Sequence, residues 1–405
     1  MAGTARAPAV AQSDGRTTSL AWLCLIVMVA LNLRPLLTSL SPLLPDIQSS
    51  TGMTYPAASL LTTLPVLMMG TVGLVSRQLQ GIVQTRTWIA TGLGAIGAAC
   101  AYRFYADTVA GLILSSLVAG FGVAIIQALM PGIIKHNYGK RTSSVIGMYS
   151  AALMGGGGLG AVLSPWTAQR LGDWHAGLAV WALPAACALL WWRITRIPTP
   201  LLGARQLAHP RFYKTPRAWL LAIHFGWING GYTTMVAWLP AFYAEHHWTR
   251  QQTGTLLGFM TAMQVVAALV LPFMARRSVD RRPWLMSGLL AQFIGYTGMI
   301  LSPGHFAWLW VATLGFGLGG TFSLCLILAL DHVKQAQRAG ELAAFVQGAG
   351  FMIAALPPFV TALLRDMTGS FHAAWSVLAA SVAILSIITL KFDPKTHQQA
   401  MGGVE

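Results

Sequence analysis

Apolar residues occur along this chain in long runs, which are separated by short stretches that contain most of the charged residues. Each run is about 20 residues long, the length that an α-helix needs to cross the hydrocarbon core of a membrane. Twelve runs can be distinguished, and they start near residues 19, 55, 87, 108, 142, 175, 218, 251, 284, 306, 341 and 371. The pattern predicts an all-α membrane protein with twelve transmembrane helices in the lipid bilayer.

A basic stretch divides the runs into two sets of six, and short patterns recur between the sets. Asn32 and Asn229 lie in the first run of each set, and Gly120 and Gly315 lie in the fourth, at nearly the same separation. Parallel six-helix repeats are typical of the major facilitator fold, whose substrate site lies between the two halves. We therefore expect a disordered tail (1–18), an N-terminal six-helix half (19–193), a basic linker (194–217), a C-terminal six-helix half (218–392) and a second tail (393–405).

The positions of the charges indicate the orientation of the chain. Only 9% of the residues are charged, whereas a soluble protein carries about 25%. The tails and the even-numbered connections hold 21 of the 26 Lys and Arg residues. The odd-numbered connections hold only Arg103, Arg170, Arg250 and Arg365. By the positive-inside rule both termini and the linker are cytoplasmic. The net charge of +15 thus reflects membrane topology, and we expect no nucleic-acid partner.

One charge is predicted to lie well inside a membrane span. This is Arg34, in the stretch LNLRPLLTSLSPLLP, where Pro35 and Pro42 interrupt the helix. A central arginine costs about 2.5–3.5 kcal/mol on insertion scales. It could donate to carbonyls that the prolines leave without an N–H donor, or its five donors could bind an anionic or polar substrate in a cavity. Since no Asp or Glu is central in a span, we favour substrate binding.

Neutral polar residues in other runs could complete such a pocket. Thr38 follows Arg34 at helical spacing, and Asn229 and Tyr232 lie three residues apart in the seventh run. The further candidates are Gln127, Tyr149, Gln264 and Gln347. For each neutral residue taken singly, a hydrogen bond between helices is as plausible as contact with a substrate. The spacing of the histidines does not suggest a metal site, and we expect no cofactor.

Several stretches resemble the cyanate transporter (CynX) family of the major facilitator superfamily: LNLRPLLTSLSPLLP, IIQALMPGIIK, YSAALMGGGGLGA, INGGYTTMVAWLPAFY and LCLILALDH. The resemblance covers nearly all twelve runs. It implies a carrier in the bacterial inner membrane that moves cyanate or a similar small anion by alternating access. The positions of Arg34, Tyr149, Asn229 and Gln347 also match a more distant relative, a 2-nitroimidazole exporter. Export of small heteroaromatic drugs is therefore the alternative function.

The loops that join helices in this superfamily carry a signature with an Asp-Arg pair. The loop after the second run, SRQLQGIVQTR, has no Asp, whereas ARRSVDRRPW after the eighth run keeps Asp280, Arg281 and Arg282. We expect inner gating to depend on these three residues. An enzyme would need a nucleophile–base pair or a metal cluster, which the runs do not provide, so we expect a transporter. We also expect this transporter to be a monomer.

Uptake of a monovalent anion into a cell is opposed by the inside-negative potential. The cost is about 2.3 kcal/mol per 100 mV for each charge. Uptake must therefore be coupled to another movement of charge. The two expected routes are entry of the substrate as its neutral acid and exchange against another anion, with His224 in the seventh run as a weak candidate for a proton carrier.

Overall fold

The computed structural model describes residues 15–401 apart from 80–83, 139–141, 196, 198–210, 276 and 334–335. All the regular secondary structure of the described residues is helical, which confirms the all-α prediction. The first part of the chain forms α1 (Gly15–Leu31), α2 (Pro35–Thr38), η1 (Ser41–Leu43), α3 (Leu44–Thr51), α4 (Tyr55–Leu79), α5 (Thr85–Tyr102), η2 (Arg103–Tyr105), α6 (Val109–Tyr138), α7 (Thr142–Leu171), α8 (Trp174–Ala179) and α9 (Ala182–Ile194). The second part forms α10 (Pro216–Glu245), α11 (Arg250–Ala275), α12 (Arg282–Leu301), α13 (Ala307–Asp331), α14 (Ala336–Ala354), α15 (Leu356–Thr368), α16 (His372–Leu390) and α17 (His397–Ala400).

Ten segments of the described chain are long and apolar enough to cross a membrane. They coincide with ten of the twelve runs in the sequence. The other two runs form α5 and α10, which are not among the ten. Helix α5 is long enough at 18 residues, but its first turn is polar and contains Arg86, and α10 contains glycine, histidine, asparagine and glutamate among its 30 residues. Twelve membrane crossings, with both termini in the cytoplasm, therefore remain a prediction.

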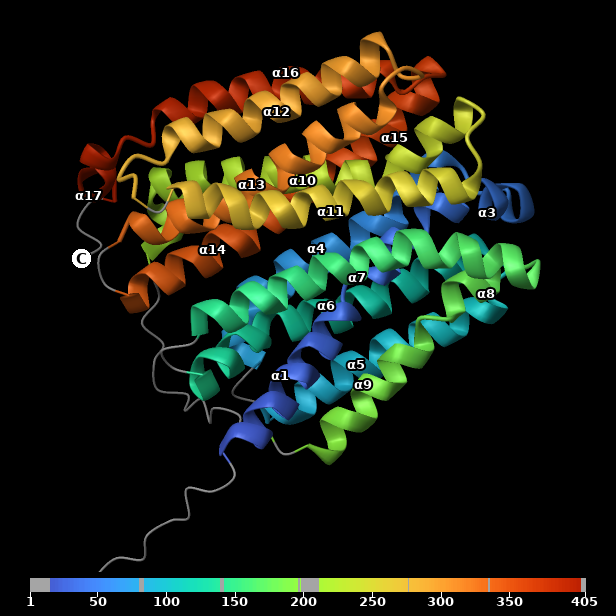
Figure 1. The fold of residues 1–405 in the computed structure, drawn as a ribbon, viewed down its shortest axis with the longest axis horizontal. Helices are drawn as coiled ribbons and strands as arrows, with labels where there is room; N and C mark the ends of the chain where they lie inside the picture. Colours follow the sequence, from blue (N-terminus) through green and yellow to red (C-terminus); the bar gives the residue numbers. More distant parts are fainter. Residues whose placement is uncertain are drawn as a thin grey trace, which may run out of the picture.

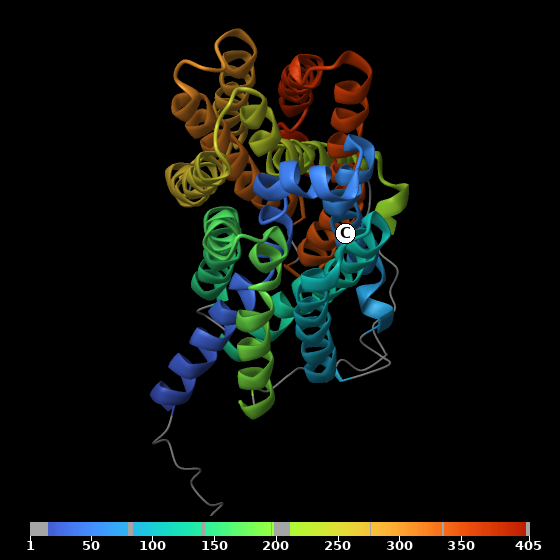
Figure 2. The same ribbon diagram turned by 90° about the vertical axis from the view of Figure 1, so that its right-hand side faces the viewer.

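The helices form two groups that lie side by side (Figures 1 and 2). In the N-terminal group, α4 and α5 both pack against α6, and α1 packs against α7. In the C-terminal group, α11 and α12 both pack against α13, and α10 packs against α14. The groups meet where α7 contacts α11 and where α4 contacts α14 and α15. The predicted domain boundaries stay a prediction, because most of 194–217 lies outside the described residues.

The termini of the described chain lie at one end of the molecule, which we call the tail end, where α1 begins and α17 lies (Figure 1). The opposite end, which contains α3 and α8, is called the far end. The predicted tails at 1–18 and 393–405 are described only in part. Helix α1 begins at Gly15, so the last four residues of the first predicted tail are helical instead of disordered. These four residues, GRTT, add about one turn of helix ahead of the apolar part of α1.

The first predicted span is a broken helix. Helix α1 ends at Leu31, and Pro35 begins the short α2, with Arg34 as its N-cap residue. Pro42 and Pro45 lie in the first turns of η1 and α3. Since proline has no N–H, it is compatible with a helix start and incompatible with a continuous helix. The prolines therefore divide one membrane span into several short helices.

Helix α7 packs closely against this broken segment. A side chain at Gly156 would collide with the carbonyl of Leu31, and a side chain at Gly160 would collide with Pro35 and Thr38. Small residues allow such close approach between membrane helices. The glycine-rich sequence of α7 thus fixes the position of the segment that contains Arg34.

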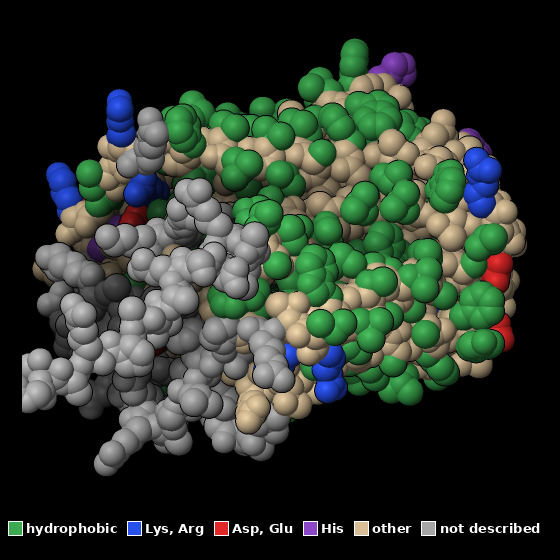
Figure 3. Space-filling model, turned by 60° about the horizontal axis from the view of Figure 1, so that its bottom comes forward, with side chains coloured by type: hydrophobic (Ala, Val, Ile, Leu, Met, Phe, Trp, Pro, Cys, Tyr) green, Lys and Arg blue, Asp and Glu red, His purple; other side chains and the backbone are tan. Residues whose placement is uncertain are grey.

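The outer surface has the character of a membrane protein. Figure 3 shows a face whose middle is covered by hydrophobic side chains, while most of the acidic side chains drawn there lie toward its ends. Large apolar residues are exposed on many helices, for example Leu163, Phe273 and Leu269. An apolar exterior of this extent would be unfavourable in water and is suited to lipid.

Candidate functional site

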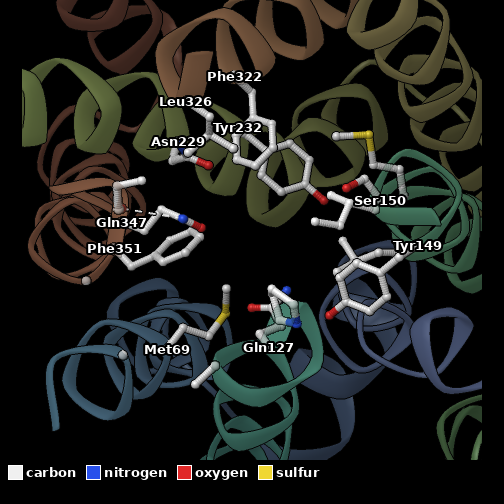
Figure 4. Close-up of a pocket in the computed structure, with 18 of the residues that line it drawn as sticks. Met69, Gln127, Tyr149, Ser150, Asn229, Tyr232, Phe322, Leu326, Gln347 and Phe351 are labelled. Atoms are coloured by element: carbon white, nitrogen blue, oxygen red, sulfur yellow. Dashed lines mark hydrogen bonds between the residues drawn. The ribbon is translucent and has the colours of Figure 1, made fainter. Parts of the chain in front are cut away.

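A cavity of about 780 Å³ lies between the two groups of helices. Its walls come from Arg34 and helices α4, α6 and α7 on one side and from α10, α11, α13 and α14 on the other. Figure 4 shows Gln127 and Tyr149 across the cavity from Asn229 and Tyr232. A site between two halves is the position expected for a substrate in a transporter of parallel six-helix repeats.

Arg34 contributes a positive charge to this cavity. The residue is only 6% exposed, and its guanidinium carbon lies 5.1 Å from the centre of the Tyr232 ring. Its Nε atom is buried without a hydrogen-bond partner. Among the residues that the structure describes, no carboxylate forms an ion pair with Arg34, and no other charged residue lines the cavity. Arg34 therefore brings a positive charge and a free N–H donor to the cavity wall.

Two neutral polar groups of the N-terminal group also lack partners. The hydroxyl of Tyr149 and the Oε1 atom of Gln127 are both buried without a hydrogen bond. Leaving a buried polar atom unpaired costs about 1–3 kcal/mol, so such atoms are rare unless a ligand or water binds them. With Arg34, these groups form a polar cluster on one side of the cavity.

The polar residues of the C-terminal group are partly engaged with their own helices. The Asn229 amide donates to the Phe225 carbonyl at 2.8 Å, and the Gln347 amide donates to the Ala343 carbonyl at 3.4 Å. An amide has a carbonyl oxygen as well as its NH₂ group. The carbonyl oxygens of these side chains can therefore accept further hydrogen bonds while the NH₂ groups donate to the helix.

The structure places most of the sequence candidates around one cavity. Seven of them line it: Arg34, Gln127, Tyr149, Asn229, Tyr232, Gln264 and Gln347. Thr38 is not among the lining residues, since it is fully buried and donates to the Arg34 carbonyl at 3.3 Å. Arg34 and Thr38 do lie one helical turn apart, since the Thr38 N–H donates to the Arg34 carbonyl. The Thr38 side chain faces α7, where a side chain at Gly160 would collide with its hydroxyl. Whether the lining residues bind a substrate stays a prediction.

Other lining residues have no signal in the sequence. The apolar wall includes Met69, Phe322 and Phe351, and Ser150 adds a hydroxyl. Apolar residues fill every run of this chain, so nothing distinguishes those that face a cavity from those that face lipid. Their role depends on how the helices are rotated, which only the structure reveals.

The three predicted gating residues lie at the tail end. Arg282 binds Asp280 at 2.8 Å and Asp393 at 3.3 Å, and Arg281 binds Asp331 at 2.9 Å. Hydrogen bonds from Arg282 hold the pKa of Asp280 below its usual value. These described ion pairs join parts of the C-terminal group to one another. A gating role for Asp280, Arg281 and Arg282 therefore remains a prediction.

An ion pair and a cation–π contact join the two groups at the far end, and the sequence analysis did not anticipate them. Asp46 of α3 binds Arg250 of α11 at 2.6 Å. The Tyr55 ring of α4 lies beneath the guanidinium of Arg365, 4.8 Å from the ring centre. Arg365 also binds Glu245 at 2.7 Å. We call these contacts the far-end bridge, and they hold the two groups together at the far end.

His224 lies away from the cavity. Its Nε2 atom is 2.9 Å from the Thr389 hydroxyl, and its Nδ1 atom is 3.3 Å from the Cys325 sulfur. These three buried residues connect α10, α13 and α16 within the C-terminal group. His224 is not among the described residues that line the cavity, so the structure favours a packing role for it.

Comparison with known proteins shows the family to which this chain belongs. The family model of the Major Facilitator Superfamily matches residues 23–356 and 231–402. The chain is 44% identical to the cyanate transport protein CynX of Escherichia coli (strain K12), over 93% of this chain and 98% of that protein. The chain belongs to the major facilitator superfamily. Within the superfamily it belongs to the family of that cyanate transport protein, as the sequence motifs predicted.

More distant proteins share part of the sequence or the fold. A 2-nitroimidazole transporter of E. coli (strain K12) is 28% identical over 91% of this chain and 93% of that protein. The fold is similar to that of a D-xylose-proton symporter, with a TM-score of 0.77, 13% identity and coverage of 94% and 98% of the two chains. It is also similar to a bacterial homologue of the lysosomal transporter Spinster, with a TM-score of 0.75, 13% identity and coverage of 96% and 98%. This major facilitator protein is a secondary transporter and a multi-pass protein of the bacterial inner membrane.

Proposed function

We propose that this transporter carries cyanate, or a monovalent anion of similar size, with Arg34 as the residue that binds the negative charge. The observation that carries the proposal is the buried guanidinium of Arg34, which lines the cavity between the two groups with an unpartnered Nε atom. The identity with a cyanate transport protein supports the choice of anion. The arginine supplies several N–H donors in one plane, and these can bind the ends of a small anion.

The cavity is large for a three-atom anion. Its volume of about 780 Å³ leaves room for water, which weakens electrostatic attraction. We infer that the two groups approach each other around the substrate during transport. The Tyr149 hydroxyl, which has no partner in the protein and lies on the same side of the cavity as Arg34, would then donate to the anion. The free Oε1 atom of Gln127 is an acceptor, so Gln127 would contribute through its NH₂ group.

We further propose that transport proceeds by alternating access. The far-end bridge joins the groups at one end. The cavity lining extends toward the other end and includes Ile146, near the start of α7, and Leu330, near the end of α13. If the tail end is cytoplasmic, as the positive-inside rule predicts, this arrangement is closed to the outside. Breaking the far-end bridge and closing the tail end would expose the site to the outside.

The cavity also favours particular routes of coupling. Among its described lining residues Arg34 is the one that is charged, and His224 is bonded elsewhere. A side chain that carries a proton is therefore not the favoured route. Entry of the anion as its neutral acid, or exchange against an internal anion, would balance the charge without such a residue.

Transport of small heteroaromatic compounds is the second candidate. Met69, Phe322 and Phe351 form an apolar wall that could pack against a planar ring, and the chain is 28% identical to a 2-nitroimidazole transporter. Cyanate is preferred because the identity to the cyanate transport protein is higher and because Arg34 favours a negative charge.

The experiment is direct binding of cyanate, bicarbonate, nitrate and 2-nitroimidazole to the purified transporter by calorimetry. Saturable binding of cyanate, with weaker binding of 2-nitroimidazole, is expected. Binding of 2-nitroimidazole without binding of any of the three anions would replace the proposal with the second candidate.

A further inference from the structure

A second arginine is buried near the segment that contains Arg34. Arg103 begins η2, directly after α5, and it is completely buried. Within the described part of the chain, no carboxylate pairs with it. Its Nε atom donates to the Ser115 hydroxyl at 3.1 Å, one Nη atom donates to the Ser116 hydroxyl at 2.9 Å, and the other donates to the Leu36 carbonyl at 3.2 Å.

The bond to Leu36 differs from the other two. Ser115 and Ser116 belong to α6, which follows Arg103 closely in the sequence, so their bonds stabilise one local helix pair. Leu36 lies in α2, two residues after Arg34, and is 67 positions from Arg103 in the sequence. This bond connects the α5–α6 pair to the short helix that Arg34 begins.

Helix α2 needs support of this kind. It has only four residues, with Arg34 as its N-cap and no side-chain cap hydrogen bond. A helix this short has few hydrogen bonds of its own and is stable only through its neighbours. On one side, α7 packs against it, and a side-chain carbon at Gly157 would lie 3.3 Å from the Arg34 Cβ. Arg103 holds the backbone through the Leu36 carbonyl.

The choice of arginine is informative. Burying a cation without an acid is costly, and a neutral amide could join α5 to α6. An arginine is needed only where acceptors in several directions must be held by one rigid, planar group. The three hydrogen bonds of Arg103 meet this description, since two are made to α6 and one is made to α2.

We propose that Arg103 is a positioning residue for anion binding: by holding the Leu36 carbonyl it sets the place of the Arg34 guanidinium in the cavity. This inference rests on the proposed function of Arg34. Arg103 does not line the cavity, so it acts through the backbone of α2 and does not touch the substrate.

The test is a double-mutant cycle on the binding of cyanate to the purified full chain. The variants are Arg103→Lys, Arg103→Gln, Arg34→Lys and the combination of Arg34→Lys with Arg103→Lys. The matched control is Gln292→Leu, which removes a buried hydrogen bond of 3.0 Å to Thr321 in the C-terminal group. Melting temperature is recorded for each variant, so that loss of stability is separated from loss of affinity.

We expect both Arg103 variants to fold and to weaken cyanate binding by about tenfold or more, which corresponds to about 1.4 kcal/mol. Arg103→Lys should cost much less in the Arg34→Lys background, because residues that act as one unit are not additive. Gln292→Leu should lower the melting temperature and leave the affinity unchanged.

Three results would overturn the inference: Arg103 variants that bind cyanate as the wild type does, losses that are equal in both backgrounds, and failure of both Arg103 variants to fold. The last would assign Arg103 to folding alone. A wild type that does not bind cyanate, or an Arg34→Ala variant that binds it normally, would instead contradict the proposed function.

Discussion

Arg34 combines burial with an incomplete set of partners. Its guanidinium packs over Tyr232, and its Nε atom has no acceptor. A cation on an aromatic ring gains about 0.5–2 kcal/mol, which offsets only part of the cost of burying the charge. An anion in the cavity would accept the hydrogen bonds that Arg34 does not make within the protein, and it would also neutralise the charge of the guanidinium.

The shape of the guanidinium should matter as well as its charge. Arg34→Lys keeps the positive charge but replaces a planar fork by a single ammonium group. We expect the affinity for cyanate to fall by about tenfold or more, or at least about 1.4 kcal/mol, measured by calorimetry. Unchanged affinity would mean that the site needs only a charge.

The neutral lining residues should contribute unequally. Tyr149→Phe removes a hydroxyl that has no partner in the protein, so the variant should lose about 1–3 kcal/mol of cyanate binding and little stability. Asn229→Ala and Gln347→Ala remove amides that already bond to their own helices and should lose less. Equal losses in all three variants would contradict this ranking.

Polar positions were the predictable part of the site. A polar side chain is conspicuous in an apolar run, and seven such residues line the cavity. Thr38 was placed by helical spacing from Arg34, and the spacing holds, but the Thr38 side chain packs against α7 and does not line the cavity. Neither the apolar wall nor the role of Arg103 could be predicted, because Arg103 was assigned to a connection between helices and is in fact completely buried.

At the scale of elements, the broken helix and the close approach of α7 depend on each other. The prolines that interrupt the first span were visible in the sequence, whereas the division of other spans into α8 and α9, and into α14 and α15, was not. Prolines lie at these breaks too, with Pro184 in the first turn of α9 and Pro357 and Pro358 at the start of α15. A proline alone does not predict a break, however, because α4, α6 and α7 each continue through an internal proline. The packing role of the α7 glycines followed from composition, but their partners in α1 and α2 did not.

Two glycines of α7 provide a matched pair. A side-chain carbon at Gly160 would lie 2.8 Å from the Pro35 Cα atom, whereas nothing lies within 4 Å of the corresponding position at Gly155. Gly160→Ala should lower both the melting temperature and the affinity for cyanate, since α2 must shift. Gly155→Ala should preserve both, with a small gain in helix propensity. Normal binding by Gly160→Ala would show that the close contact does not position Arg34.

At the scale of the whole molecule, the proposed alternating access gives the far-end bridge the role of stabilising the conformation whose far end is closed. Asp46 and Arg250 are partly exposed, with exposed side-chain fractions of 32% and 43%. An exposed ion pair contributes about 0.2–1 kcal/mol, so a single pair can bias two conformations without locking either. The sequence predicted two halves with a site between them. It could not predict the conformation, since pairs such as this form only between distant elements.

Weakening the bridge should therefore shift the conformational equilibrium. In Arg250→Gln, spin labels on α3 and α11 should report a larger population of long distances than in the wild type. Arg170→Gln is the control, because the described contact of Arg170 is with Trp166 of its own helix, α7. If both variants gave the wild-type distribution, the bridge would have no part in closing the far end.

Coupling can be tested in proteoliposomes under an imposed potential, with and without a pH gradient. We expect cyanate uptake to require either an inside-alkaline gradient, which favours entry of the neutral acid, or an internal anion for exchange. The reason is that Arg34 is the one charged residue among the described cavity lining. Uptake that follows an inside-positive potential alone, whatever the pH gradient and the internal anion, would indicate simple uniport.

The most direct test of the account is cyanate binding by Arg34→Ala, compared with the wild type by calorimetry on purified protein of confirmed folding. The account predicts saturable binding by the wild type and none by the variant, because the variant removes the guanidinium and leaves no charged residue among the described cavity lining. Wild-type affinity in Arg34→Ala would contradict the central claim and would make Arg34 a structural residue of the broken helix.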